Sequence, residues 1–204
     1  PKSRPIEKRY LLPDGRSAWG RLHLVALATE DSGTLVIAQV EDITERKRAE
    51  AQLVRQATFD ALTGLPNRSE SMRRLRDTLE TDRANGEMTA VFFCDLDRLK
   101  LVNDTHGHAV GDVYIREVSR RIRDSVRDGD IVGRLSGDEF VVVVQGIGSP
   151  TEALGLAGRI VDAVREPLHL AGERFSPSLS LGIAYSGGMS TTADDLLAEA
   201  DSAM

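Results

Sequence analysis

The spacing of apolar and polar residues divides the chain into three segments of different character. In residues 6–41, apolar and polar side chains alternate, most clearly over residues 21–26, which is the period of a half-buried strand. A PDG sequence at 13–15 and an EDSG sequence at 30–33 provide turn residues between the runs. We predict a hairpin or meander of about three strands, which is little chain to bury a core alone and is expected to be the tail of a larger domain.

Residues 42–58 are densely charged, contain no Gly or Pro, and carry sparse apolar residues such as Ile43, Ala49 and Leu53. This composition predicts a helical connector. Two interpretations stay open, a solvated single helix and a short parallel coiled coil that joins two protomers.

From residue 59 onward the pattern alternates between helix and strand. Helices are predicted over residues 67–83, 110–126, 151–164 and 192–204. Strands are predicted over residues 89–95, 130–135, 140–144 and 176–186. We expect Asn103 and Asp112 on the loop that follows strand 89–95. The order of elements predicts an α+β domain with a central, mainly antiparallel sheet flanked by helices.

Composition narrows the class of protein. The net charge of −6 argues against a nucleic-acid or membrane-surface binder, because both favour a basic face. Cys94 is the single cysteine, which rules out an internal disulfide and fits a reducing compartment. No apolar run approaches the roughly 18 to 20 residues that span a bilayer. We expect a cytoplasmic chain, or the cytoplasmic portion of a membrane-bound sensor, cut from a longer protein.

Carboxylates gather at the ends of two predicted strands. Asp95 directly follows the apolar run VFFC, in a partly desolvated position that is costly unless a cation neutralises it. Asp138 and Glu139 lie in the turn of RLSGDEF, and they converge with Asp95 if strands 89–95 and 140–144 are neighbours. Such oxygen ligands favour Mg²⁺ over zinc. The alternative is a hairpin that is acidic only for solubility.

A pocket of this kind is suited to nucleotidyl or phosphoryl transfer. Carboxylate-held divalent ions neutralise a triphosphate and lower the pKa of an attacking hydroxyl, and small turn residues let backbone N–H groups approach phosphate. Asp112 could accept hydrogen bonds from guanine N1–H and N2–H₂, beside Asn103. His106 and His108 make a weak case for zinc, so we expect them to shape the loop, and we interpret Cys94 as a small core residue.

Five motifs give the sequence a specific resemblance. FDALTGLPNR (59–68), CDLDRLKLVNDTHGHAVGD (94–112), RLSGDEFVVVV (134–144), SLSLGIA (178–184) and LLAEADSAM (196–204) occur in the order seen in GGDEF domains, the diguanylate cyclases of bacteria. The resemblance covers residues 59–204. Residues 1–43, with their closing DIT, resemble the C-terminal part of a PAS sensor domain, and residues 44–58 resemble the helical linker that leads into such output domains.

The resemblance implies a palm-like domain, related to nucleotidyl cyclases, that condenses two GTP to cyclic di-GMP with release of pyrophosphate. Two domains would meet at least transiently as a homodimer, each with one GTP and its Mg²⁺, for which Mn²⁺ could substitute. The implied metal ligands are Asp95, the carbonyl of Leu96, Asp138 and Glu139. Asp138 and Glu139 are the implied catalytic residues, and Glu139 either binds metal or activates the 3′-hydroxyl. The implied GTP-binding residues are Lys100, Asn103, Asp104, His108, Asp112, Ser136 and Gly137.

A further match, RDGD at 127–130, ends five residues before Ser136. In the family, an Arg-x-x-Asp at this distance is the product-inhibition site, where Arg127 and Asp130 would bind cyclic di-GMP. The alternative is an ordinary helix end, with Arg127 near the last carbonyls.

The sequence departs from the family pattern in three places. Ser136 replaces the first glycine of the signature, Leu99 stands where an aromatic is common, and the family's downstream phosphate-binding Lys and Arg are expected beyond residue 204. The first and third of these departures keep a second function open, a weak GGDEF module that binds GTP or cyclic di-GMP and regulates a downstream phosphodiesterase (EAL) domain. A bare PAS-linked dimerisation module is the third hypothesis, which the intact carboxylates disfavour.

Overall fold

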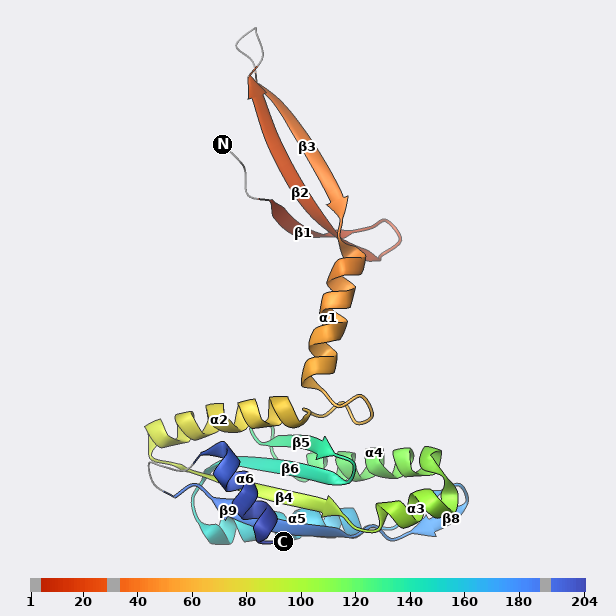
Figure 1. The fold of residues 1–204 in the computed structure, drawn as a ribbon, viewed down its shortest axis with the longest axis vertical. Helices are drawn as coiled ribbons and strands as arrows, with labels where there is room; N and C mark the ends of the chain where they lie inside the picture. The colour runs from red at the N-terminus through yellow and green to blue at the C-terminus, as the bar shows by residue number, and fades with distance from the viewer. Residues whose placement is uncertain (1–4, 29–33, 188–191) are drawn as a thin grey trace. The chain divides into compact units, whose positions relative to one another are not determined.

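The computed structural model describes residues 5–28, 34–187 and 192–204. The chain forms two compact units, residues 1–55 and 56–204, which are considered separately (Figure 1). The predicted EDSG turn at 30–33 lies outside the described residues.

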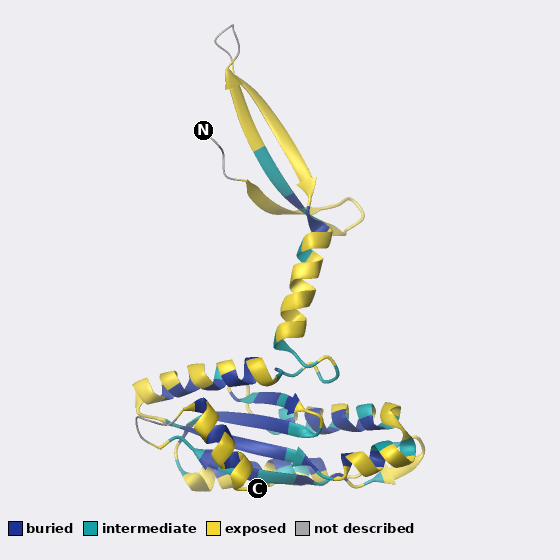
Figure 2. Cartoon of the chain, in the orientation of Figure 1, coloured by how far each residue is buried: buried dark blue, intermediate teal, exposed yellow. Residues whose placement is uncertain are grey.

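The first unit contains a three-stranded antiparallel sheet in the order β1 (Ile6–Leu11), β2 (Ser17–Ala28) and β3 (Thr34–Asp42). The prediction of about three strands is therefore confirmed. The PDG turn joins β1 to β2, with Gly15 at a φ of +80°, a conformation that glycine adopts without steric cost. Within these strands only Gly20 is buried, and most of the sheet is coloured as exposed in Figure 2.

Helix α1 (Thr44–Thr58) begins directly after β3, and hydrogen bonds fix this junction. The N–H of Trp19 donates to Thr44 Oγ1 at 2.8 Å, and the N–H of Ile43 donates to the Trp19 carbonyl at 2.8 Å. Glu7 of β1 accepts from Arg46 and Lys47 of α1, each at 2.7 Å. Within the first unit, the start of α1 is therefore tied to the sheet through both backbone and side chains.

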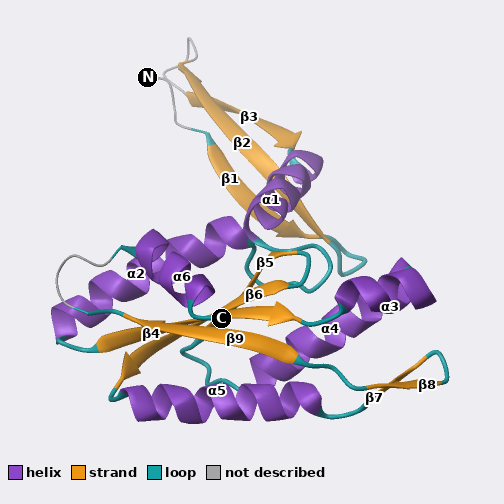
Figure 3. Cartoon of the chain, turned by 60° about the horizontal axis from the view of Figure 1, so that its bottom comes forward, coloured by secondary structure: helices purple, strands orange, loops and turns teal. Residues whose placement is uncertain are grey.

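The second unit is built on one sheet in the order β5 (Ile131–Ser136), β6 (Glu139–Ile147), β4 (Met88–Leu96) and β9 (Leu179–Tyr185), and every neighbouring pair is antiparallel. Five helices flank it, namely α2 (Arg68–Asn85), α3 (Leu99–His106), α4 (His108–Asp124), α5 (Pro150–Arg165) and α6 (Ala193–Ser202). A small hairpin, β7 (Leu168–Leu170) and β8 (Glu173–Phe175), precedes β9 (Figure 3). The predicted α+β class is confirmed.

Alternation along the central strands produces two cores, one on each side of the sheet. Val91 and Phe93 of β4 pack with α2 and α6, whereas Phe92 and Cys94 pack with α3, α4 and α5. A Cβ on Gly182 of β9 would lie 2.0 Å from the Ala200 carbonyl, so glycine permits the close approach of α6. This two-sided burial holds β4 rigidly up to its acidic end.

The loop predicted after β4 was wrong. Asn103 lies on helix α3, and Asp112 lies on α4, within the range 110–126 that was also predicted as helix. The hairpin β7–β8 was not predicted. Helix α3 has only eight residues, and its N-cap position, Arg98, has a φ of +62° and makes no side-chain capping bond. A helix without a capping residue gives no start signal in the sequence, and strands of three residues carry little periodicity.

Candidate functional site

The acidic end of β4 lies beside the turn that joins β5 to β6. In the antiparallel register of β4 and β6, Asp95 is directly opposite Glu139. The N–H of Leu96 donates to the carbonyl of Asp138 at 3.0 Å, so the backbones stay in contact past that pair. The two strands are neighbours, which is the condition on which convergence depended, and their pairing brings Asp95, Asp138 and Glu139 together at one end of the sheet.

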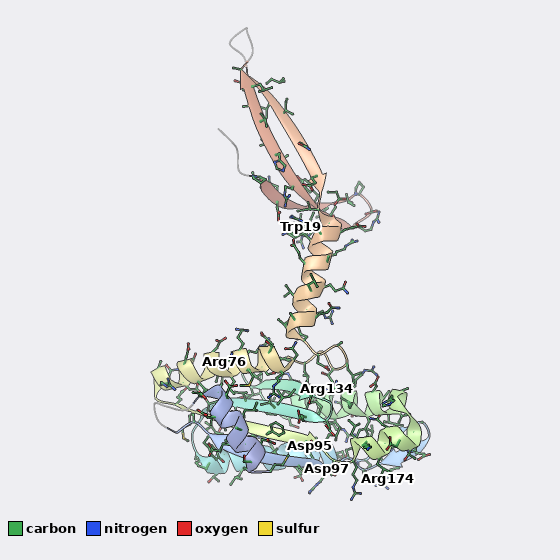
Figure 4. The ribbon with its side chains drawn as sticks, in the orientation of Figure 1. Trp19, Arg76, Asp95, Asp97, Arg134 and Arg174 are labelled. Atoms are coloured by element: carbon green, nitrogen blue, oxygen red, sulfur yellow. The ribbon has the colours of Figure 1, made fainter. Side chains whose placement is uncertain are left out.

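Negative charge is concentrated here. Burial raises the pKa of the Asp95 carboxyl above its ordinary value, and the nearby charges of Asp138, Asp97 and Glu139 raise it further. Asp97 is held by a 2.8 Å hydrogen bond from the Ser180 hydroxyl of β9, and Figure 4 labels Asp95 and Asp97 at the end of β4. A cation bound here would relieve the repulsion between these carboxylates, so its binding is electrostatically favourable.

The acidic turn, residues 136–139, begins with Ser136, which stands where the GGDEF signature has its first glycine. The Ser136 hydroxyl donates to Glu139 Oε2 at 2.5 Å. Gly137 has a φ of +34°, and a Cβ there would meet no atom within 4 Å. The serine therefore contacts the acidic side chain directly, and the space above Gly137 is open to a ligand.

The five other GTP-binding candidates lie on the two helices after β4. Asn103 and Asp112 are half-buried, while Lys100, Asp104 and His108 are exposed. A Cβ on Gly111 would lie 1.8 Å from Asn103 Oδ1, so this glycine lets Asn103 pack against the start of α4. The structure thus packs Asn103 against Gly111 and leaves Lys100, Asp104 and His108 exposed to solvent.

Two of the four RDGD residues, Arg127 and Asp130, line a separate pocket of about 470 Å³, called the RDGD pocket below. The Asp130 side chain is 2% exposed. It accepts hydrogen bonds from the backbone N–H of Arg127 at 3.2 Å and from Arg127 Nε at 3.3 Å. Arg127 Nη2 also donates to the carbonyl of Gln145 on β6. Glu152 and Arg159 of α5 line the same pocket. Arg127 is thus bound to a strand carbonyl beyond the end of α4, which does not fit the helix-end alternative.

Cys94 and His106 were not expected to bind a metal, and each is packed within the domain. Cys94 is fully buried, and burial raises the pKa of its thiol to about 12, so it is an unreactive core residue, as predicted. His106 packs edge-on against Phe175, with ring centroids 5.1 Å apart, and its Nε2 lies 3.6 Å from a Glu173 carboxylate oxygen.

The donor set of the acidic site fits Mg²⁺. Within the ranges that the structure describes, no group of three or more His, Cys, Asp or Glu side chains is arranged to hold a metal alone. Asp95 and Asp138 provide carboxylates at one edge, and Mg²⁺ is usually bound by one or two carboxylates together with substrate phosphates.

Sequence reasoning missed two residues near these sites. Arg134 donates two hydrogen bonds to the Gly137 carbonyl, and Arg159 lines the pocket beside Arg127. Neither shows a local signal, since their roles depend on folding. Asp97, which belongs to the acidic run after β4 in the sequence, adds charge beside Asp95.

The second unit is thus an antiparallel α+β domain with carboxylates gathered where β4 ends and β6 begins. Residues 57–204 match the family model described as "Diguanylate cyclase, GGDEF domain". The match covers most of the chain, and the chain belongs to the GGDEF family.

Characterised relatives share the same domain. Diguanylate cyclase TpbB of Pseudomonas aeruginosa is 41% identical over 155 residues, which are 76% of this chain and 36% of TpbB. A structure comprising only the TpbB GGDEF domain matches with a TM-score of 0.68 at 40% identity, covering 71% of this chain and 85% of that one. The bifunctional diguanylate cyclase/cyclic di-GMP phosphodiesterase MucR of the same species is 38% identical over 161 residues, 79% of this chain and 23% of MucR.

Another similar structure was solved with a nucleotide bound. The GGDEF domain of DgcB from Caulobacter crescentus, solved in complex with c-di-GMP, matches with a TM-score of 0.67 at 25% identity, covering 72% of this chain and 86% of that one. The chain spans 22%, 25% and 36% of the length of three curated relatives. Across the described part of the chain, no helix has both the length and the apolarity needed to cross a membrane.

Proposed function

We propose that residues 57–204 act as a diguanylate cyclase, converting two GTP into one cyclic di-GMP and two pyrophosphates. The observation that carries this proposal is the convergence of Asp95, Asp138 and Glu139 at the β4–β6 edge, in a domain related to TpbB. In each half-reaction a 3′-hydroxyl oxygen bonds to the α-phosphorus of the other GTP, the bond to pyrophosphate breaks, and the hydroxyl proton leaves to a base.

The carboxylates have distinct roles in this proposal. Asp95, Asp138 and the Leu96 carbonyl hold Mg²⁺, in whose place Mn²⁺ could serve. The ion, when bound, neutralises the triphosphate and lowers the pKa of the attacking hydroxyl. Glu139 faces Asp95 across the strand pair and accepts the hydroxyl proton or completes the metal site. One of its carboxylate oxygens, Oε2, accepts a hydrogen bond from the Ser136 hydroxyl.

The GTP-binding residues surround this edge. Ser136 and Gly137 offer backbone N–H groups to phosphate oxygens, helped by the open space above Gly137. Lys100 contributes charge toward the phosphates. Asn103 and Asp112 recognise the guanine edge, with Asp104 and His108 on the same pair of helices. A site of this kind holds one GTP, so condensation requires two domains facing each other, at least transiently as a homodimer.

We further propose that the RDGD pocket is a product-inhibition site. Its volume of about 470 Å³ falls in the range of small-ligand pockets, and it presents Arg127 and Arg159 to an anion. Asp130 holds Arg127 in place through its backbone and its Nε. The DgcB domain, in complex with c-di-GMP, shows that a similar domain binds this nucleotide.

Residues 1–43 are proposed to be the end of a PAS sensor domain, with 44–58 as its linker. The exposed apolar side chains of the sheet, such as Val36 and Val40, are the kind of surface that packs against further protein. The hydrogen bond from the Trp19 N–H to Thr44 and the one from the Ile43 N–H to the Trp19 carbonyl would pass a change in the sheet to the start of α1.

The experiment is an incubation of the longest soluble chain with GTP and Mg²⁺, followed by chromatography for cyclic di-GMP. The Glu139→Gln variant should retain the fold and lose about 10²- to 10⁴-fold in rate, as loss of an acid–base group does. Retained activity in this variant would show that the role assigned to Glu139 is wrong. The second candidate, a regulatory module for a downstream EAL domain, is favoured by the similarity to MucR and predicts GTP or cyclic di-GMP binding without turnover.

A further inference from the structure

Arg134 connects the acidic turn to the chain that enters the domain. Its guanidinium donates twice to the carbonyl of Gly137, from Nε at 3.0 Å and from Nη2 at 2.7 Å. The remaining nitrogen, Nη1, lies 3.0 Å from Asp60 Oδ1. Figure 4 labels Arg134 on β5, the strand that leads into the acidic turn. The side chain is 10% exposed, so these charge-assisted bonds form largely away from solvent.

These bonds fix the orientation of a site carboxylate. The carbonyl of Gly137 and the N–H of Asp138 belong to one planar peptide group, so holding the oxygen sets the direction of the whole plane. The next peptide group is held as well, because the Asp138 carbonyl accepts from Leu96 N–H at 3.0 Å. Asp138 therefore lies between two fixed peptide planes, one held by β4 and the other by Arg134.

Asp60 belongs to the junction turn, residues 59–67, which links α1 to α2. Its carboxylate accepts from the backbone N–H and the hydroxyl of Thr63, at 2.8 and 2.6 Å, in addition to Arg134. Burial alone would raise the pKa of Asp60, but the hydrogen bonds from Thr63 and Arg134 hold it below its ordinary value. The carboxylate is thus charged and held on both sides.

The junction turn is in turn bound to the last residues of α1 and to β5. Asn67 donates from its N–H to the Thr58 carbonyl at 3.0 Å and from its side chain to the Ala57 carbonyl at 2.9 Å. The backbone N–H of Arg134 donates to the Pro66 carbonyl at 2.9 Å. Displacement of residues 57 and 58 would therefore move the turn and act on Arg134 through two contacts.

We propose that Arg134 is a positioning residue for the cyclase reaction, and that Asp60 couples its position to the end of α1. The inference rests on the proposed function for its kinetic consequence, but its structural part stands apart from it. When the junction turn shifts, Arg134 follows Asp60, the Gly137–Asp138 peptide rotates, and the Asp138 carboxylate leaves its place near Asp95. The state of the linker helix thus reaches the metal site without an intervening ligand.

The test compares Asp60→Asn, Arg134→Lys and Arg134→Ala with the unchanged chain. Asp60→Asn keeps the shape that accepts from Thr63 and removes the charge paired with Arg134. Arg134→Lys keeps the charge but cannot grip Gly137 twice while pairing with Asp60. Arg73→Ala is the control, because Arg73 is an exposed arginine of α2 that pairs with Glu70 and Asp77 and not with the acidic turn.

Hydrogen–deuterium exchange of peptides covering residues 135–140 gives a readout that does not need activity. We expect Asp60→Asn and Arg134→Ala to raise exchange there by about tenfold, as loss of a charge-assisted hydrogen bond allows, with no change in a peptide from α5 or in Arg73→Ala. Arg134→Lys should lie between. Exchange in 135–140 that stays unchanged in a folded Asp60→Asn chain overturns the proposal, even if Arg134→Ala fails to fold.

Kinetics add the second readout. Misplacing a metal ligand should lower kcat by about ten- to a hundredfold while KM for GTP changes by less than about threefold. A purely structural ion pair would lower the melting temperature of both Arg134 variants and leave kcat per folded molecule unchanged, which would contradict the positioning role. If the unchanged chain makes no cyclic di-GMP, the proposed function fails, and the exchange result still decides the coupling.

Discussion

Asp95 and Glu139 lie directly opposite each other in the β4–β6 ladder, although they are far apart in the sequence. Like charges at such a position destabilise a sheet, since opposed side chains are neighbours. The fold maintains the pair through two-sided burial of β4 and the hydrogen bond from Leu96 to Asp138. This is the arrangement expected where a cation and a triphosphate complete the site.

The first prediction concerns this repulsion. In the absence of metal at neutral pH, Asp95→Asn should raise the melting temperature by about 1–2 °C, because solvent screening limits the relief to about 0.5 kcal/mol. Asp162→Asn, on the exposed face of α5, should not. Calorimetry measures the melting temperatures of both variants, with and without Mg²⁺ and GTP. A lower melting temperature for metal-free Asp95→Asn would mean that the charge is stabilised by the protein.

The second prediction concerns Ser136. The Ser136 hydroxyl donates a hydrogen bond to Glu139 Oε2. Removing it in Ser136→Gly should raise the rate of cyclic di-GMP formation by at most about fivefold, which corresponds to the free energy of one hydrogen bond. Ser136→Ala removes the hydroxyl and keeps the Cβ, so comparing the two separates the hydrogen bond from steric contact with phosphate. A tenfold loss in both variants would instead make the serine a required residue.

The third prediction concerns feedback. Arg127→Ala should weaken inhibition by cyclic di-GMP by about ten- to a hundredfold, which is the loss of charge-assisted hydrogen bonds, and it should leave the uninhibited rate intact. Arg165→Ala, an exposed arginine at the end of α5, is the matched control. Initial rates at several product concentrations give the inhibition constant. An unchanged constant would remove the pocket from the inhibitory role.

The fourth prediction concerns acid stability. Hydrogen bonds from Arg73 and Arg74 lower the pKa of Glu70 from its ordinary 4.5 to about 2. The folded pKa lies below the unfolded one, so the stabilisation is fully present above about pH 4.5 and is lost as the pH falls toward 2. Glu70→Gln should therefore cost about 1 kcal/mol at pH 7 and flatten the decline of unfolding free energy in acid. Denaturant titrations at pH 7, 4 and 2.5 check this, with exposed Glu80→Gln as control.

Much of the fold was predictable because long elements carry their own period. Met72, Leu75 and Leu79 give α2 an apolar face, and all three are buried as that face requires. The run at Val91–Cys94 and the run at Phe140–Val144 predicted two buried central strands, which are paired in the sheet. The short α3 and the hairpin β7–β8 were not predictable, because three to eight residues without caps carry little signal.

The site divides in the same way. Asp95, Asp138 and Glu139 were predicted because a carboxylate beside a buried strand conflicts with its surroundings and therefore indicates function. The role of Arg134 was not predictable, since its partners Asp60 and Gly137 are joined only by folding, and Asp60 is 74 residues away. Charge conflicts are visible in a sequence, whereas long-range satisfied pairs are not.

The measurement that tests the central claim most directly is the stoichiometry of the reaction with GTP and Mg²⁺. Chromatography should show cyclic di-GMP and pyrophosphate appearing in a ratio of one to two in the unchanged chain, and neither product in Glu139→Gln. Binding of GTP without formation of cyclic di-GMP by the longest soluble chain would contradict the account and would leave the domain as a nucleotide-binding regulator.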